Sequence, residues 1–167
     1  PNPSTALNAV IKSLELKKGD EVLATNHEYG AMDRTWEFTS QQKGFKYINL
    51  DINVPINSTE DFIKKFESSI NTKTKVIFVS HITSSTGIIF PVKDLSELAK
   101  RHNIIMIIDG AHAPAQIDLS IREIDPDIYT GACHKWMMAP KGSSFLYAKK
   151  SFQENIDPLV ISWGWEP

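Results

Sequence analysis

Cysteine is almost absent from this sequence, because Cys133 is the only one among 167 residues. No disulfide can form within the chain, and such sparse cysteine is typical of proteins from a reducing compartment. No apolar run approaches the roughly 20 residues that cross a bilayer, and no secretory signal pattern is present. We therefore expect a cytoplasmic protein with no membrane partner.

An excess of charge of one sign is also missing. The sequence has 18 lysine and arginine residues against 20 aspartate and glutamate residues, which leaves a net charge of −2. Proteins that bind nucleic acids or anionic membrane surfaces typically carry a basic patch. We therefore expect no nucleic-acid partner and a site for a small molecule instead.

The chain also lacks an initiating methionine and a polar C-terminal tail. Its first residues lead directly into a helical pattern, and its last residues include Trp163 and Trp165. A length of 167 residues suits one domain with its own core. We expect residues 1–167 to form a single domain that is a piece of a longer polypeptide.

Helical and strand patterns alternate along the chain. Apolar residues recur at helical spacing in residues 7–14, 31–42, 58–70 and 93–102. Apolar runs of strand length occupy residues 22–24, 45–50, 76–80, 104–109, 127–130 and 143–148, with a loop over residues 110–126. Strands that alternate with helices form parallel sheets with both faces covered. We therefore predict an α/β fold of three layers, α/β/α, with a mostly parallel central sheet.

Polar clusters follow four of these predicted strands. They begin at Asn26, Ser80, Asp109 and Cys133. In parallel sheets of this kind, ligands bind beyond the carboxyl ends of the strands. The four clusters are therefore expected to meet in one site.

Asp109 and Lys135 carry the most specific chemical signal. Asp109 ends the apolar run that starts at Ile104, and Lys135 lies 26 residues further on, in a turn between Gly131 and Trp136. Pyridoxal 5'-phosphate (PLP) needs a lysine amine that forms a Schiff base with its aldehyde. It also needs a carboxylate that keeps its pyridine nitrogen protonated. The pair therefore predicts a PLP site.

Both residues also have ordinary interpretations. Lys135 resembles the solvated surface lysines found in most proteins, and Asp109 could be a helix cap or a turn residue. Against this, the small and apolar neighbours of Lys135 would lower the pKa of its amine. A buried carboxylate at Asp109 needs a partner, and a pyridinium N–H is a suitable one. Taken together, the pair favours a functional interpretation.

Further candidates surround this pair. Ser4 and Thr5 open the first helix, where they could be simple caps or could hold a phosphate group through free N–H groups and the helix dipole. His27 and Tyr29 each offer a flat ring that could stack on a cofactor, or that could be structural. Nothing local separates these alternatives.

The five histidines allow a rival hypothesis of a metal-dependent hydrolase, with His81, Asp109, His112 and His134 as ligands. No HExxH or CxxC spacing supports it, so we predict no metal site. We interpret His112 as a hydrogen-bonding partner of the cofactor, with a satisfied loop histidine as the alternative. His134 could donate to phosphate or orient the turn. A non-catalytic α/β scaffold is the second rival.

With these residues in hand, the sequence resembles the class V aminotransferase family of PLP enzymes, of fold type I. The likeness is greatest to the isopenicillin N epimerase-like group. It lies in residues 1–8, 81–87, 108–114 and 130–143, in the family's order. It implies the large PLP-binding domain of a fold type I enzyme, with an N-terminal segment and a C-terminal small domain missing.

The resemblance also implies roles for single residues. Lys135 would form the Schiff base and remove the substrate's α-proton, Asp109 would pair with the pyridine nitrogen, and His112 would lie near the cofactor's phenolic oxygen. The remaining cofactor contacts would come from Ser4, Thr5 and His134 at the phosphate, from His27 or Tyr29 stacked on the ring, and from Ser84.

Three positions depart from the desulfurase branch of this family. Ala132 stands where relatives often carry serine or asparagine, and Ser84 stands where desulfurase-like members carry asparagine. Cys133 lies beside the lysine, outside the downstream loop that holds the reactive cysteine of desulfurases, so we interpret it as structural. These departures favour an epimerase-like enzyme acting on a small amino acid. A cysteine desulfurase or C–S lyase, or an aminotransferase, is the alternative.

The resemblance has two consequences for assembly. Family members are homodimers, so we expect a homodimer of the full-length protein. The arginine that holds the substrate carboxylate is expected beyond Pro167. We therefore expect this chain alone to be poorly active.

Overall fold

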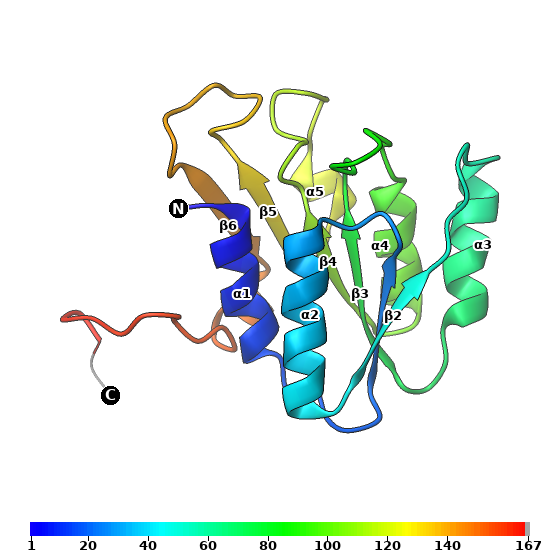
Figure 1. The fold of residues 1–167 in the computed structure, drawn as a ribbon, viewed down its shortest axis with the longest axis horizontal. Coiled ribbons are helices and arrows are strands. Elements are labelled where there is room, and N and C mark those ends of the chain that lie inside the picture. The colour runs from blue at the N-terminus through cyan, green and yellow to red at the C-terminus, as the bar shows by residue number, and fades with distance from the viewer. Residues whose placement is uncertain (166–167) are drawn as a thin grey trace.

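The computed structural model describes residues 1–165 of the protein. A six-stranded sheet runs through its centre in the order β2-β1-β3-β4-β5-β6 (Figure 1). The strands are β1 (Glu21–Thr25), β2 (Lys46–Leu50), β3 (Thr74–Ser80), β4 (Ile105–Asp109), β5 (Ile128–Ala132) and β6 (Ser144–Ala148). β1 to β5 run parallel to one another, and β6 pairs with β5 in the antiparallel sense. The predicted mostly parallel sheet is confirmed.

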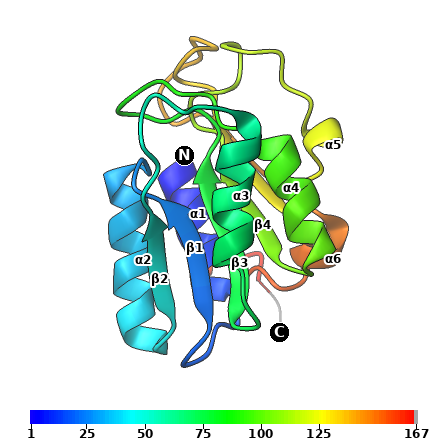
Figure 2. The same ribbon diagram turned by 90° about the vertical axis from the view of Figure 1, so that its right-hand side faces the viewer.

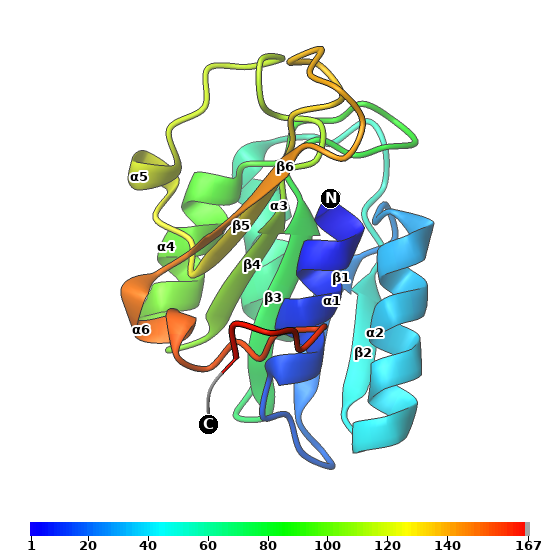
Figure 3. The same ribbon diagram turned by 90° about the vertical axis from the view of Figure 1, so that its left-hand side faces the viewer.

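Helices cover both faces of this sheet. Figure 2 shows α2 and α3 on opposite sides of the strands, and Figure 3 shows α1 beside α2, with β6 along the outer edge. The helices are α1 (Pro3–Ser13), α2 (Gly30–Lys43), α3 (Thr59–Ser69), α4 (Val92–Arg101), α5 (Ile121–Ile124) and α6 (Lys150–Gln153). The fold is therefore α/β/α, as the alternation of patterns predicts. Within the described residues, no helix is both long and apolar enough to cross a membrane.

The side chains of β3 explain why its sequence is apolar throughout. Val76 and Phe78 pack in the core beneath α1 and α2, which centres on the fully buried Trp36. Ile77 and Val79 point to the other face and pack in the core beneath α3 and α4. Because successive strand residues face opposite sides, a strand buried on both faces shows no polar alternation.

Two helix starts show how local sequence sets these elements. The side chain of Ser58 accepts a hydrogen bond from the backbone N–H of Asp61, which caps α3 as its sequence predicts. At α1 the cap is Asn2, whose Oδ1 accepts from the backbone N–H of Thr5 at 2.8 Å. Ser4 and Thr5 therefore lie inside the first turn rather than at the capping position.

Two short helices were not predicted from the sequence. α5 lies within the segment predicted as a loop, and α6 follows β6 directly. Each has four residues, which is about one turn. One turn is too short to show a 3.6-residue period, so the apolar pattern carries no signal for it.

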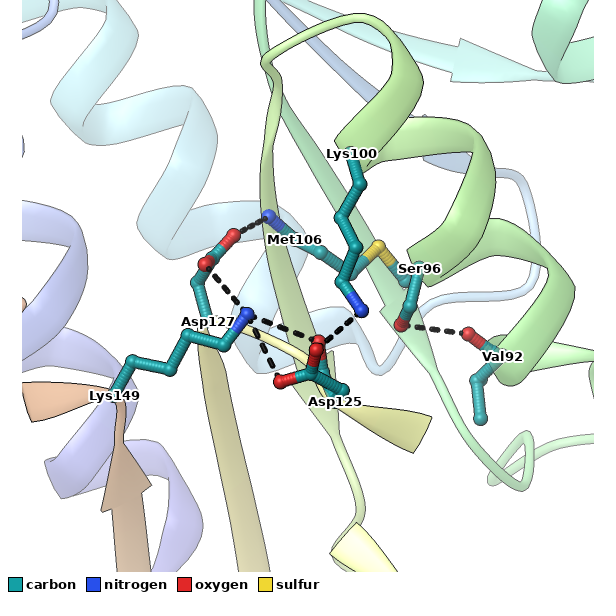
Figure 4. A network of polar contacts seen from close by, with 7 residues as sticks. All are labelled: Val92, Ser96, Lys100, Met106, Asp125, Asp127 and Lys149. Carbon is teal, nitrogen blue, oxygen red and sulfur yellow. Dashed lines mark hydrogen bonds and ion pairs between the residues drawn. The ribbon is translucent and has the colours of Figure 1, made fainter. Parts of the chain in front are cut away.

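A polar network lies at the amino-terminal ends of the parallel strands β4 and β5 (Figure 4). Lys149 lies 3.0 Å from the carboxylate of Asp125 and 3.5 Å from that of Asp127. Asp125 also pairs with Lys100 of α4. Asp127 accepts a hydrogen bond from the backbone N–H of Met106 at 2.8 Å. These contacts join α4 to the start of β4, the start of β5 and the end of β6.

Candidate active site

A cavity of about 320 Å³ lies beyond the carboxyl ends of β3, β4 and β5 and beside the first turn of α1. Seven of the nine residues predicted as site residues line it, and two, Thr5 and His27, do not. The seven are Ser4, Tyr29, Ser84, Asp109, His112, His134 and Lys135. The polar clusters that follow separate strands therefore meet in one place, as parallel strand ends require.

Asp109 is the most buried titratable group of the cavity. It ends β4, with 4% of its surface exposed, and its Oδ1 accepts a hydrogen bond from the backbone N–H of Ala111 at 3.0 Å. No donor among the described residues is hydrogen-bonded to Oδ2. Burial raises the pKa of Asp109, whereas the Ala111 hydrogen bond and the charge of Lys135 lower it. A cationic N–H donor in the cavity would give Oδ2 of Asp109 a hydrogen bond and would neutralise the buried charge.

Gly110 lets the chain turn directly after Asp109. A Cβ at Gly110 would lie 2.2 Å from the ring of Tyr129, far inside van der Waals contact. The Tyr129 hydroxyl lies 2.8 Å from Nδ1 of His81, and the ring stacks on Phe145, so the ring is held in place. The close approach of backbone and ring therefore requires glycine at this position.

Lys135 reaches the cavity from the loop between β5 and β6. Both ends of this loop are held at the sheet, where Ala132 pairs with Ser144 and the backbone N–H of Cys133 donates to Ser143 at 3.1 Å. The Nζ of Lys135 lies 2.9 Å from Nε2 of His112. Partial removal of water lowers the pKa of Lys135, and the negative charge of Asp109 opposes this effect. The lowered pKa agrees in direction with the prediction from its apolar neighbours.

The candidate phosphate-binding residues differ in position. Ser4 lines the cavity in the first turn of α1, but the Thr5 hydroxyl is 3.1 Å from Asn2 Oδ1 and does not face the cavity. His134 Nδ1 is 2.9 Å from the carbonyl oxygen of Ser143, so this nitrogen carries a proton. The other ring nitrogen of His134 is then the one available to a ligand.

His27 and Tyr29 are separated by their orientation. His27 Nε2 lies 2.7 Å from the carbonyl oxygen of Ile52, and its ring meets Phe90 edge-on at 6.3 Å. The His27 ring therefore makes contacts within the protein and does not line the cavity. Tyr29 lines the cavity and is about half exposed. Of the two rings, Tyr29 is therefore the one that can contact a ligand.

Sequence reasoning missed Glu28, a buried carboxyl group behind the cavity. Its Oε1 accepts from the Thr25 hydroxyl at 2.6 Å, and its Oε2 accepts from both the backbone N–H and the hydroxyl of Ser80 at 2.7 Å. Burial raises the pKa of Glu28 to about 7. Glu28 thereby joins the end of β1 to Ser80, which lines the cavity. A glutamate directly after a buried strand was the available signal.

The metal hypothesis has no geometric support. The described residues contain no group of three or more histidine, cysteine, aspartate or glutamate side chains able to hold a metal ion. Of its proposed ligands, His81 instead contacts Tyr129, and burial lowers the pKa of His81 to about 4. Cys133, the first residue of the β5–β6 loop, is partly buried.

A comparison with family models decides the relationship of this chain. The model described as "Aminotransferase class-V" matches residues 2–164. The chain belongs to the class V aminotransferase family. The resemblance inferred from the sequence motifs is therefore confirmed.

Relatives within the class V aminotransferase family differ in activity. An isopenicillin N epimerase of Streptomyces clavuligerus is 32% identical over 166 residues, which are 99% of this chain and 42% of the relative. A probable cysteine desulfurase of Halalkalibacterium halodurans is 31% identical over 93% of this chain and 38% of the relative. The chain thus spans about two fifths of the length of these relatives, and they do not single out one reaction.

Solved structures of the family share this fold. The cystine C-S lyase C-DES, in complex with its product cysteine persulfide, matches with a TM-score of 0.90 at 23% identity, over 97% of this chain and 43% of that chain. An apo cysteine desulfurase of Thermococcus onnurineus matches with a TM-score of 0.84 at 24% identity, over 98% and 40%. At this identity the likeness establishes the fold alone.

Proposed function

We propose that this cavity binds PLP and that the chain supplies the cofactor-binding part of an enzyme acting on an amino acid. One observation carries the proposal. The buried carboxylate of Asp109 and the amine of Lys135 line the same cavity, and Asp109 Oδ2 has no hydrogen-bond donor among the described residues. A variant of C-DES with glycine covalently linked to its PLP cofactor is among the structures that share the fold.

Asp109 would accept a hydrogen bond from the protonated pyridine nitrogen through its Oδ2. The ion pair would favour the charged carboxylate and offset the effect of burial on the pKa of Asp109. When bound, PLP supplies a cationic ring that accepts the electron pair left on the substrate's α-carbon. The buried position of Asp109 keeps water from competing for its oxygen.

Lys135 would hold the cofactor covalently through its amine nitrogen, which reaches the cavity beside His112. When the substrate is bound, the free Lys135 amine would accept the α-proton as a general base. A lowered pKa suits both roles, because only the unprotonated amine attacks a carbonyl or accepts a proton.

The first turn of α1 would hold the phosphate group. The backbone N–H of Ser4 and the positive end of the helix dipole favour a dianion there, and Ser4 adds a hydroxyl on the cavity side. His134 would place its second ring nitrogen, Nε2, beside the phosphate. Ser84 lines the same cavity and is a further hydroxyl donor. Tyr29 would contact the ring face, and His112 the phenolic oxygen.

Epimerisation of an amino acid, as in the isopenicillin N epimerases, is the reaction we favour, because those relatives match nearly the whole chain at 32% identity. The alternatives are desulfurase or C–S lyase chemistry and transamination, which share proton removal at the α-carbon. We further propose that the full-length enzyme is a homodimer and that residues outside this chain hold the substrate carboxylate.

The experiment is to add PLP to the purified protein and to follow the absorbance band at the edge of the visible range that a lysine-bound cofactor gives. Borohydride reduction should fix the label on Lys135, located by mass spectrometry. Lys135→Ala should abolish the reducible label, while Lys141→Ala, in the same loop, should keep it. An unlabelled wild-type protein would support the non-catalytic scaffold instead.

The role of Asp109 needs a separate assay. Asp109→Ala should still acquire the label on Lys135 but should exchange the α-proton of a bound amino acid with D2O at least 100-fold more slowly, since a missing catalytic electrostatic partner costs about that much. Wild-type exchange rates in Asp109→Ala would exclude the ring-protonating role of this carboxylate.

A further inference from the structure

His112 lies between two nitrogen atoms of the β5–β6 loop. Its Nε2 is 2.9 Å from Nζ of Lys135, and its Nδ1 is 3.2 Å from the indole nitrogen of Trp136. Consecutive residues of one loop therefore hold opposite edges of the same ring. Their donor and acceptor properties determine where the protons lie.

The indole nitrogen of Trp136 is a donor only. His112 Nδ1 must therefore accept this hydrogen bond through its lone pair, and the neutral ring carries its proton on Nε2. That N–H points at Nζ of Lys135 at hydrogen-bond distance. An ammonium group has no lone pair, so only the unprotonated amine of Lys135 can accept it.

The opposite arrangement has a clear cost. With the proton on Nδ1, Nε2 of His112 could accept from a Lys135 ammonium, but the Trp136 N–H would then face another N–H. Partial burial lowers the pKa of His112, which favours the neutral ring. The hydrogen bond from Trp136 thus selects between two neutral tautomers of His112.

We propose that Trp136 is a positioning residue whose N–H fixes the His112 tautomer, so that His112 donates to Lys135 and keeps its amine unprotonated. The inference rests on the proposed function, in which this amine is the reacting group. It adds a device that prepares the amine before the cofactor or the substrate arrives. Trp136 itself does not line the cavity.

Other titratable groups face Lys135 as well. Asp109, at the end of β4, favours the ammonium form of Lys135 and so opposes His112. Tyr29, before α2, and His134, in the same loop as Lys135, line the cavity with them. All of these groups remain in place in a variant of Trp136, so a change caused by that variant reports on the His112 contact.

The test measures the protonation of Lys135 without PLP. The apoprotein is pulsed with a small acylating reagent between pH 6 and 11, and modification of Lys135 is counted by mass spectrometry. Trp136→Phe keeps an aromatic ring but removes the donor. It should raise the apparent pKa of Lys135 by about one unit, which lowers its labelling at pH 8 about tenfold. Trp163→Phe, at a fully exposed tryptophan, should change nothing.

His112→Gln serves as the rescue variant. A glutamine amide can accept from Trp136 through its oxygen and donate to Lys135 through its nitrogen, so the low pKa of Lys135 should persist. Adding Trp136→Phe to His112→Gln should raise the pKa of Lys135 again, because the amide is then free to flip and to accept from the Lys135 ammonium through its oxygen. An unchanged Lys135 titration in Trp136→Phe alone would overturn the proposal.

Failure of the proposed function would look different. If Trp136→Phe shifts the Lys135 titration but the wild-type protein takes up no PLP, the tautomer relay stands and the cofactor assignment fails. If PLP labels Lys135 in the wild type but Trp136→Phe leaves its titration unchanged, the cofactor assignment stands and the relay fails.

Discussion

Glu28 is the residue whose charge depends most directly on pH in the neutral range. Its pKa rises from 4.5 to about 7 on burial, so between these values the folded protein binds a proton that the unfolded chain has released. The contribution of Glu28 to the free energy of unfolding is fully present below about pH 4.5 and is lost as the pH rises through 7.

Glu28→Gln removes this titration, which gives the first stability prediction. Between pH 4.5 and 8, the free energy of unfolding of the wild type should fall relative to Glu28→Gln by about 3 kcal/mol, the equivalent of the pKa shift. Urea unfolding of both proteins at several pH values measures it. A constant difference between them at all pH values contradicts the raised pKa. His81, whose pKa is lowered, titrates in both proteins and cancels.

Gly110 tests the close contact behind the candidate cofactor site. Gly110→Ala places a methyl group 2.2 Å from the Tyr129 ring, and overpacking of this kind costs about 1–3 kcal/mol. The same change at Gly164, where a Cβ meets nothing within 4 Å, is the matched control. Urea unfolding should show a loss in the first variant only. Equal stability of both variants would mean that Tyr129 moves aside freely.

Single residues also mark where sequence reasoning stops. Asp109 and Lys135 could be predicted to line one cavity, because the carboxyl ends of parallel strands lie at the same end of the sheet. The direction of the His27 ring could not, since it depends on Ile52, which follows a different strand. Glu28 was missed because its burial depends on Ser80, 52 residues away. Local sequence carries no record of such contacts.

At the scale of elements, the network around Lys149 secures the ends of β5 and β6 (Figure 4). Lys149→Met should lower the free energy of unfolding by about 1 kcal/mol, because its ion pairs with Asp125 and Asp127 are partly exposed. Lys150→Met removes a neighbouring lysine that is exposed and is the control.

The salt dependence of this variant gives a second readout. Ion pairs near the surface are screened, so the difference between Lys149→Met and wild type should shrink in 1 M NaCl, where the screening length is about 3 Å. Thermal unfolding at low and high salt measures it. A difference that does not respond to salt would point to lost packing of the lysine stem instead.

The elements themselves were largely predictable. Long amphipathic helices such as α3 and α4 and two-sided apolar strands such as β3 and β4 carry strong periodic signals, and these positions agree with the structure to within a few residues. The antiparallel direction of β6 was not predicted, because a strand's pattern is the same in either direction. It follows from the short β5–β6 connection, which cannot cross over the sheet.

At the scale of the whole molecule, the candidate cofactor cavity and the ion-pair network of Lys149 lie at opposite ends of the strands. The cavity takes residues from four strand ends and from α1, whereas the network of Lys149 lies where the strands begin. Variants at the two ends of the strands should therefore affect different properties. Lys149→Met should lower stability without changing PLP labelling of Lys135, and Lys135→Ala should abolish labelling without lowering stability.

The hairpin-like return of the chain after β5 gives Lys135 a property that no free amine has. Each end of its loop is fastened to one of two adjacent strands, where Ala132 pairs with Ser144. In the proposed function, Lys135 would therefore act as a tethered amine. It would stay within reach of the cofactor after displacement by the substrate, at an effective molarity far above that of a dissolved amine. Its return to the cofactor would then need no diffusion through solvent.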